Sequence, residues 1–277
     1  MALSIQSNMS SLSIQNQLSR TNNDLSTALE RLGSGYRINS AKDDAAGLQI
    51  ANRLNAQVRG QEAAIYNANN AQSMMQTAEG AFEEMTNIAY RMKELATQGA
   101  NGTNNASEYT ALDAEYQELA LELDSIMTNT SYGAGTALLD GGKFSAAVTF
   151  QVGSSAAETL AVNISAEITA VTGAVGAPGA LTDQTTSGTA MGTVDTLIDN
   201  IGAARAALGA SMNRLDHTIN NVGNMAENTQ AAAGQLMDAD FAKETSNMTK
   251  HQLLMNSGIS VLSASNSTTQ MIGSLLR

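Results

Sequence analysis

Cysteine and tryptophan are absent from this chain of 277 residues, and Pro178 is its one proline. Without cysteine the chain can form neither a disulfide nor a thiolate metal site. Aromatic residues make up 4% of the sequence, fewer than a thick enzyme core of this length uses. These absences favour thin layers of helices packed through Ala, Leu, Ile and Met, and the 14 methionines suit the irregular gaps between helices.

Long apolar runs and a basic surface are also lacking. No stretch of about 18 apolar residues occurs, so we expect no transmembrane helix and no membrane insertion. The first residues, MALSIQSNMSSLSIQNQL, have no basic segment and no continuous apolar segment, so we expect no cleavable secretory signal. The formal net charge of -12 argues against nucleic acid as a partner, because binding its backbone requires lysine and arginine.

The strongest pattern present is a column of apolar residues at every seventh position from Val194 to Leu236, interrupted at Thr229. A second column follows four residues behind it, from Ile198 to Ala233. This spacing predicts one face of a long helix. An uninterrupted helix over 194–236 would be roughly 65 Å long, so it needs equally long partners.

The same spacing predicts further helices over 3–32, 45–98, 109–126 and 241–276. The a/d seam expected on 109–126 comprises Tyr109, Leu112, Tyr116, Leu119, Leu123 and Ile126, and the column expected on 241–276 comprises Phe241, Met248, Met255 and Leu262. Ser40 is the expected N-cap of the helix at 45–98, with Asp43 and Asp44 in its first turn. Period-two stretches at 144–152 and 160–168 predict a small hairpin. The Gly, Ala, Thr and Ser composition of 170–192 predicts a loop.

The expected fold is therefore mainly α, with long antiparallel coiled-coil helices in which the N- and C-terminal segments pair, plus a small β-hairpin insert. Each seam could also be plain intramolecular core. The two histidines, His217 and His251, lie on separate predicted helices, and the sequence Asp140-Gly141-Gly142-Lys143 lacks the first glycine of a phosphate-binding loop. We accordingly predict no catalytic residue, no metal and no cofactor.

Two segments closely resemble bacterial flagellin: LERLGSGYRINSAKDDAAGLQIANRL at 29–54 and SNMTKHQLLMNSGISVLSASNSTTQMIGSLLR at 246–277. The similarity continues through YRMKELATQGAN, FQVGSSAAETLAVNI and DADFAKETSNM, and covers the chain except 170–192. The resemblance implies a short flagellin that is exported unfolded by the flagellar type III apparatus and polymerises into the flagellar filament for swimming. The alternatives are a hook-filament junction-type axial protein and a chemoreceptor-like coiled coil, which would need a membrane anchor.

The resemblance also implies a division into domains. Residues 1–44 and 237–277 would form an inner coiled-coil domain, and residues 45–140 with 191–236 would form a middle helical bundle. The segment 33–47 would be the spoke that connects them. Residues 141–169 would be a hairpin of that bundle, and 170–190 a reduced variable surface loop. The implied partners are other flagellin subunits, an export chaperone, the filament cap and junction proteins, and the Toll-like and plant flagellin receptors.

Candidate contact residues follow from these assignments. Because a two-helix pair of such polar helices is marginal alone, we expect the terminal helices to order on polymerisation through Leu18, Leu25, Leu32, Met248, Met255, Leu262 and Leu276. The mixed charges of the spoke suggest subunit contacts at Arg37, Asn39, Lys42, Asp43 and Asp44, although a solvated helix start would look the same.

By resemblance, the Toll-like receptor would contact Arg91, Leu95, Gln98 and Glu115, and the plant receptor would read residues 30–51. A solvated helix face that packs against other subunits is the plainer interpretation of the first set. O-glycans are possible on hydroxyls of the hairpin and loop, including Ser145, Ser154, Ser155, Thr172 and Thr185.

Overall fold

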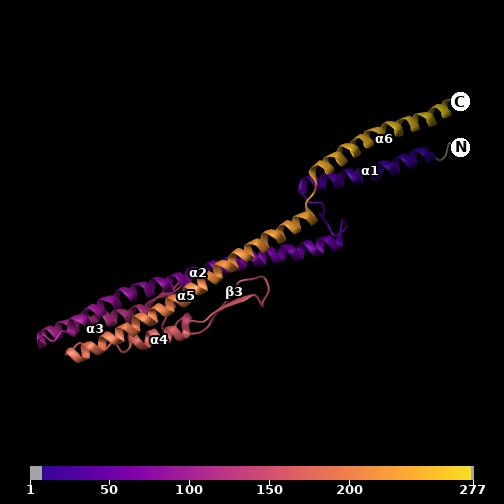
Figure 1. Cartoon of the computed structure of the whole chain (residues 1–277). Coiled ribbons are helices and arrows are strands. Elements are labelled where there is room, and N and C mark those ends of the chain that lie inside the picture. Colours follow the sequence, from indigo (N-terminus) through magenta and orange to yellow (C-terminus); the bar gives the residue numbers. More distant parts are fainter. Residues whose placement is uncertain (1–7, 276–277) are drawn as a thin grey trace. The chain divides into compact units, whose positions relative to one another are not determined.

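The computed structural model describes residues 8–275, which are mainly helical (Figure 1). Its helices are α1 (Met9–Ser34), α2 (Ala45–Gly99), α3 (Ala106–Asn129), α4 (Ser165–Val175), α5 (Gln184–Met237) and α6 (Phe241–Leu275). Short elements lie between α3 and α4: β1 (Ser131–Tyr132), β2 (Thr136–Ala137), the 3-10 turn η1 (Lys143–Ser145), β3 (Val148–Gln151) and β4 (Thr159–Val162). The expected fold class is confirmed.

The chain divides into two compact units. Unit 1 comprises residues 1–56 and 228–277, and unit 2 comprises residues 57–227. The helices α2 and α5 each contribute residues to both units. The domain boundaries expected from the resemblance stay predictions.

In unit 1, α1 lies antiparallel to α6. Ser11 near the start of α1 contacts Ser265 near the end of α6, whereas Arg31 near the end of α1 contacts Glu244 near the start of α6. Helix α1 ends at Ser34 and is capped by Gly35, whose φ of 78° lies in the left-handed region and whose N–H donates to the carbonyl of Arg31. Glycine takes that conformation without steric cost, which fixes the end of the helix.

The start of α2 differs from the prediction. The Asp44 Oδ1 accepts a hydrogen bond of 2.8 Å from the Gly47 N–H, so Asp44 is the N-cap of a helix that begins at Ala45. Ser40 lies too far upstream to cap α2, and its hydroxyl instead donates to Asp43 Oδ2 at 3.0 Å. The expectation of Ser40 as the cap was therefore wrong.

The core of unit 2 lies among α2, α3, α4, α5 and the hairpin. The predicted column on α5 is confirmed here, because Val194, Ile201, Leu208 and Leu215 are at most 2% exposed. On α3 the prediction was partly wrong: the buried residues are Tyr116, Ala120, Leu123 and Met127, whereas Leu112, Leu119 and Ile126 are only partly buried. The buried stripe includes one alanine and one methionine that the expected a/d seam left out.

The hairpin is shorter than predicted. Strands β3 and β4 pair antiparallel with Phe150 opposite Leu160, and its tip packs closely on α2, where a Cβ on Gly60 would lie 2.8 Å from the Ser154 Cβ. The expected second strand ends early because the Asn163 side chain accepts from the Ser165 N–H and hydroxyl where α4 begins.

The predicted loop at 170–192 is the main correction. Residues 165–175 form α4, which buries Ile168, Val171 and Val175 at helical spacing. Helix α5 begins at Gln184, after Asp183 accepts hydrogen bonds from the N–H groups of Thr185 and Thr186. Only 176–183 is irregular between the two helices. That 170–190 is the reduced variable part of the family stays a prediction.

The short loop at 176–183 is held in place by α3. The Tyr116 hydroxyl donates to the Pro178 carbonyl at 2.5 Å, and the Leu181 N–H donates to Asp113 Oδ1 at 2.7 Å. Burial raises the pKa of the Tyr116 phenol above its ordinary value. The loop is therefore an anchored part of unit 2.

Candidate assembly surfaces

The terminal helices of unit 1 face each other through the residues predicted from sequence. Leu25 is buried, and Leu18, Leu32, Met248, Met255 and Leu262 are partly buried. Leu276 lies outside the described residues. Phe241 was expected to begin the α6 column, but it is 58% exposed. Glu244, three residues later, lies in the seam instead.

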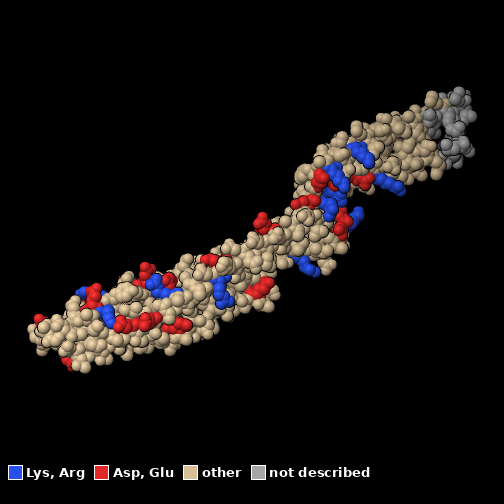
Figure 2. Space-filling view, in the orientation of Figure 1, with Lys and Arg blue, Asp and Glu red and all other residues tan. Residues whose placement is uncertain are grey.

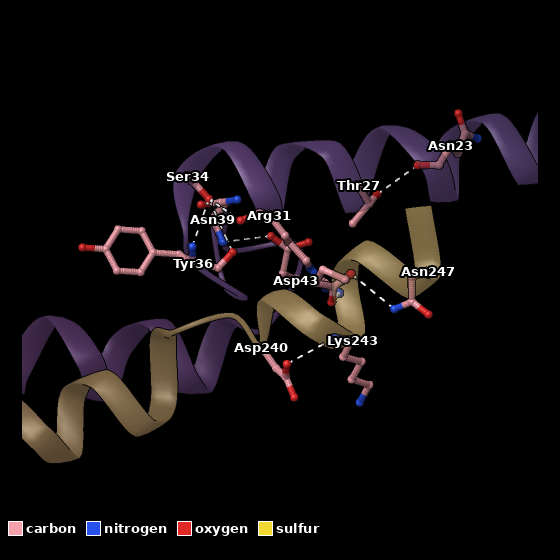
Figure 3. Close-up of polar contacts among 11 residues, drawn as sticks. Asn23, Thr27, Arg31, Ser34, Tyr36, Asn39, Asp43, Asp240, Lys243 and Asn247 are labelled. Atoms are coloured by element: carbon pink, nitrogen blue, oxygen red, sulfur yellow. Dashed lines mark hydrogen bonds and ion pairs between the residues drawn. The ribbon is translucent and has the colours of Figure 1, made fainter. Parts of the chain in front are cut away.

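Polar residues occupy the seam, which the sequence analysis missed. Ser11, Thr21 and Glu244 are 7%, 4% and 6% exposed. Glu244 forms an ion pair of 3.3 Å with Arg31 and accepts a hydrogen bond of 3.3 Å from the Asn247 amide (Figure 3). The spacing of Glu244 to Met248 by four residues was the available signal, but a search for apolar columns passes over a glutamate.

The part of this helix pair that lies nearest the chain ends carries no charged side chain. Residues 1–19 and 252–276 contain no Asp, Glu, Lys or Arg, and Figure 2 shows the corresponding part of α1 and α6 as an almost continuous uncharged surface. Several large apolar side chains are exposed there: Met9, Leu12, Leu253, Leu254, Ile259, Val261 and Met271, between 47% and 68%. Apolar surface of this extent is typical of an interaction face.

A groove of about 240 Å³ runs along the same region. It is lined by Ile14, Gln17, Leu18 and Thr21 of α1 and by Leu254, Ser257, Gly258 and Val261 of α6. The exposed Leu254 and Val261 form one wall. The lining is mainly apolar and uncharged, so the groove suits another apolar helix.

The spoke segment is attached to the end of α5. Tyr36 and Asp238 form an antiparallel bridge, and the Ala239 N–H donates to the Gly35 carbonyl at 2.9 Å. The Arg37 guanidinium donates to the Leu236 carbonyl at 2.8 Å, at the C-terminal end of α5. Cations are favourable at this end of a helix, so Arg37 has an internal role whatever it contacts outside the subunit.

Among the other spoke residues, Asn39, Ser40 and Asp43 form a hydrogen-bonded turn. The Ser40 hydroxyl and N–H donate to the Asp43 carboxylate. The Asn39 N–H donates to the same carboxylate (Figure 3). The hydroxyl contact, first among these, holds the pKa of Asp43 below its usual value. Lys42 is exposed. Contacts of these residues with other subunits stay predictions.

The residues expected to contact the Toll-like receptor do not all lie on the surface of unit 2. The Arg91 guanidinium lies 2.7 Å from Glu115 and 3.0 Å from Glu94, and these contacts, that with Glu115 foremost, raise the pKa of Arg91. Gln98 is exposed. Leu95 is 1% exposed and belongs to the core of unit 2. Its assignment as a receptor contact stays a prediction, to which this burial lends no support.

The candidate glycan hydroxyls are mostly accessible. Ser145, Ser154, Ser155 and Thr185 are exposed. Thr172 is only partly buried, but its hydroxyl donates to the Ile168 carbonyl within α4 at 3.0 Å. These four residues are thus more accessible than Thr172, although the Ser145 hydroxyl likewise donates to a carbonyl, that of Gly142, at 2.6 Å.

No built chemical site emerges from the part of the chain that is described. Over residues 8–275 no three His, Cys, Asp or Glu side chains gather as a metal site would require, and no helix there is long and apolar enough to span a membrane. His251 lies in the α1–α6 seam, with its side chain 19% exposed.

Comparison with known proteins gives a consistent result. The family model of the bacterial flagellin N-terminal helical region matches residues 5–144, and that of the C-terminal helical region matches residues 191–276. A flagellin of Listeria innocua is 36% identical over 286 residues, which cover 99% of each chain.

Two solved structures share the fold. The crystal structure of Bacillus cereus flagellin is 33% identical, with a TM-score of 0.50, and the match covers 61% of this chain and 94% of that one. A putative flagellar hook-associated protein from Vibrio parahaemolyticus has a TM-score of 0.57 at 15% identity, over 71% of this chain and all of that chain. At that identity the second likeness shows the fold alone.

Proposed function

The chain belongs to the bacterial flagellin family, whose members are structural subunits of the extracellular flagellar filament, and we propose that the uncharged end of its α1–α6 pair is the surface through which its subunits polymerise. The observation that carries this proposal is the exposed apolar surface of residues 8–19 and 252–271, which contains no charged side chain. In a polymer, neighbouring subunits would cover that surface and gain the free energy of its burial.

The terminal helices are proposed to become fully ordered only in the polymer. Over its described side chains, α6 has no apolar residue among the buried ones, and α1 buries only Leu25 and Ala28. A pair of helices with so little buried apolar surface is marginal in water. Contacts with other subunits would supply the missing burial.

Seeded assembly tests this proposal. Purified subunit is mixed with short filament fragments and followed by electron microscopy, while circular dichroism measures helix content. We expect long tubes and a gain in helix. Limited proteolysis of the free subunit should trim both ends first. A fully helical, protease-resistant subunit that ignores seeds would instead favour the hook-filament junction-type alternative, which the shared fold leaves open.

The finer partners are proposed from the family. They are an export chaperone that holds the C-terminal helix, the type III export apparatus, the filament cap and the junction proteins. The uncharged part of α6 from residue 252 onward, with its exposed apolar side chains, supports a chaperone contact, because this surface needs cover before assembly. A catalytic role is not proposed, since a filament subunit acts by packing and transmitting force.

Recognition by innate immune receptors is proposed for the free subunit. On the Toll-like receptor side, the proposed contact residues are Arg91, Leu95, Gln98 and Glu115, of which all but the buried Leu95 are exposed. We expect the subunit, and not the filament, to activate the receptor. The double variant Arg91→Ala with Glu115→Ala should weaken a cell-based receptor response; an unchanged response would remove the assignment. The plant receptor is proposed to read 30–51.

O-glycosylation is proposed on the exposed hydroxyls of Ser145, Ser154, Ser155 and Thr185. Intact mass measured on protein from the native bacterium decides the matter. A mass above 28.8 kDa by whole sugar units would support glycans, and peptide mapping would assign them. A mass equal to that of the bare chain would rule them out in that preparation.

A further inference from the structure

The facing residues of α1 and α6 differ from one heptad to the next. Four such pairs follow one another along the seam: Arg31 with Glu244, Asp24 with His251, Leu18 with Gly258, and Ser11 with Ser265. On α6 these positions are seven residues apart, and on α1 they are six or seven apart. Each pair has a different chemistry, so each position along the seam is distinct.

The charged pairs lie toward the junction with the spoke. Arg31 Nη1 lies 3.3 Å from Glu244 Oε1, and the Glu244 side chain is only 8% exposed. A buried carboxylate is strongly destabilising without its cation. His251 Nδ1 is 4.0 Å from Asp24 Oδ2, too far for a hydrogen bond, so this pair attracts only when the imidazole is protonated.

The neutral pairs lie toward the chain ends. A Cβ on Gly258 would lie 2.9 Å from the Leu18 Cδ2, so the glycine provides the space that the leucine fills. The hydroxyls of Ser11 and Ser265 are 3.2 Å apart, and the Ser11 hydroxyl also donates to Asn266 Oδ1 at 2.7 Å. These contacts provide hydrogen-bond partners for the hydroxyl of the buried Ser11.

The apolar part of the seam cannot define the alignment by itself. Its large residues repeat every seven positions: Leu18, Leu25 and Leu32 on α1, and Met248, Met255 and Leu262 on α6. Sliding one helix by seven residues would again place leucine against methionine or leucine. Apolar heptads therefore permit several alignments of nearly equal burial.

The four pairs remove that degeneracy. A slide in one direction would bring Asp24 to Glu244, two like charges, and Leu18 to His251. A slide in the other direction would bring Arg31 to His251 and leave the buried Glu244 without a cation on α1. Both alignments lose the space at Gly258 for Leu18. Each alternative alignment is thus penalised at more than one position.

We propose that these four pairs are a register code, which specifies one alignment of α1 with α6. The partner that fits α1 is an α6 helix with Glu, His, Gly and Ser at these four positions, from the same chain or from a second copy. The Arg31–Glu244 pair contributes most to this alignment, because Glu244 is a buried charged residue of the described seam and Arg31 is its cation. This inference concerns helix alignment and does not depend on polymerisation.

Disulfide trapping in the full-length chain tests the code, because the sequence contains no cysteine of its own. Ser11→Cys with Ser265→Cys reports the observed alignment. Leu18→Cys with His251→Cys reports the alignment shifted by one heptad, in which position 244 faces Asp24. Both pairs are oxidised mildly with and without Glu244→Arg, which opposes Arg31 in the observed alignment and attracts Asp24 in the shifted one.

We expect Glu244→Arg to lower the yield of the first disulfide by about fivefold or more and to raise that of the second. The charge swap Arg31→Glu with Glu244→Arg should restore the original yields. Glu30→Arg, which makes the same change of charge at an exposed neighbouring position, is the matched control and should leave both yields unchanged.

Two outcomes would overturn the proposal. Equal yields with and without Glu244→Arg would mean that the connecting segments alone fix the alignment. Loss of the first disulfide that the charge swap does not restore would mean that Glu244 acts through packing and not through its charge. The helix content of each variant, measured by circular dichroism, distinguishes a shifted alignment of α1 and α6 from unfolding of unit 2.

Discussion

Apolar and charged residues are distributed in opposite ways in unit 1 and unit 2. Unit 2 buries a continuous core and exposes few large apolar residues, namely Tyr66, Tyr90, Leu121 and Met225. It also carries nineteen of the 26 acidic residues but only six of the 14 basic ones. Unit 1 is nearly neutral and exposes most of the large apolar side chains.

Because of this difference, unit 2 is the part that stabilises the free subunit, and unit 1 is the part that gains free energy on assembly. A strongly acidic surface keeps free subunits apart and soluble, and a closed core stabilises unit 2 without a partner. Unit 1 lacks both features. Its weak self-packing and its neutral, apolar surface leave free energy to be gained only when other subunits cover it. Substitutions in the two units should therefore affect different measurements.

The largest effect on the free subunit is expected in the core of unit 2. Phe82 is fully buried, and Phe82→Ala should lower the free energy of unfolding of this unit by about 3–5 kcal/mol through lost burial and a cavity. Denaturant unfolding of the subunit measures it. Leu25→Ala in the α1–α6 seam should shift the same transition much less; equal shifts would mean that the units unfold as one.

The next effect should appear in assembly alone. Leu253 and Ile259 are 65% and 55% exposed on α6, so Leu253→Ser with Ile259→Ser removes apolar surface without disturbing the core. We expect an unfolding midpoint close to that of the parent and at least about tenfold slower seeded growth, which corresponds to roughly 1.4 kcal/mol. Normal growth would show that this face of α6 remains uncovered in the polymer. Leu121→Ser on unit 2, also exposed, is the comparison variant.

The sequence predicted the faces of the long helices, but it missed one helix. The columns on α5 and the six described leucines and methionines of the terminal helices followed from spacing, because apolar periodicity reports helix faces directly. Helix α4 was missed because its Ala, Gly and Thr content reads as loop, although Ile168, Val171 and Val175 carry the helical spacing. Tertiary packing overrode that weak local preference.

The errors at the candidate sites have a different origin. Glu244 and Ser11 were missed because their burial depends on the facing helix, which spacing within one helix does not reveal. Leu95 was assigned to a receptor contact by resemblance, and only the fold shows that its side chain lies in the core of unit 2. The pairs Arg91–Glu115 and Arg31–Glu244 join residues 24 and 213 positions apart, and only the fold brings them together.

A smaller effect is expected at the start of α2. Asp44 caps this helix through the Gly47 N–H, and Asp44→Ala should destabilise unit 1 by about 0.5–2 kcal/mol. Asp44→Asn retains the capping oxygen and should cost a few tenths of that. Hydrogen exchange of the first turn of α2 measures local opening, and unchanged exchange in Asp44→Ala would show that α2 begins without help from this side chain.

The smallest effect concerns the pH dependence of the turn at 39–44. The pKa of Asp43 is lowered, first by the Ser40 hydroxyl and then by the Ser40 N–H. A carboxyl whose pKa is lower in the folded state stabilises it above its unfolded pKa, and that contribution is lost as the pH falls through the folded value. Since the normal value is 3.8, the window lies below about pH 4. Ser40→Ala should raise the Asp43 pKa toward the normal value, as measured by NMR titration. An unchanged pKa would mean that the backbone N–H groups alone are enough to keep the Asp43 pKa low. The turn would then differ from the seam of α1 and α6, because it would not depend on contacts between side chains.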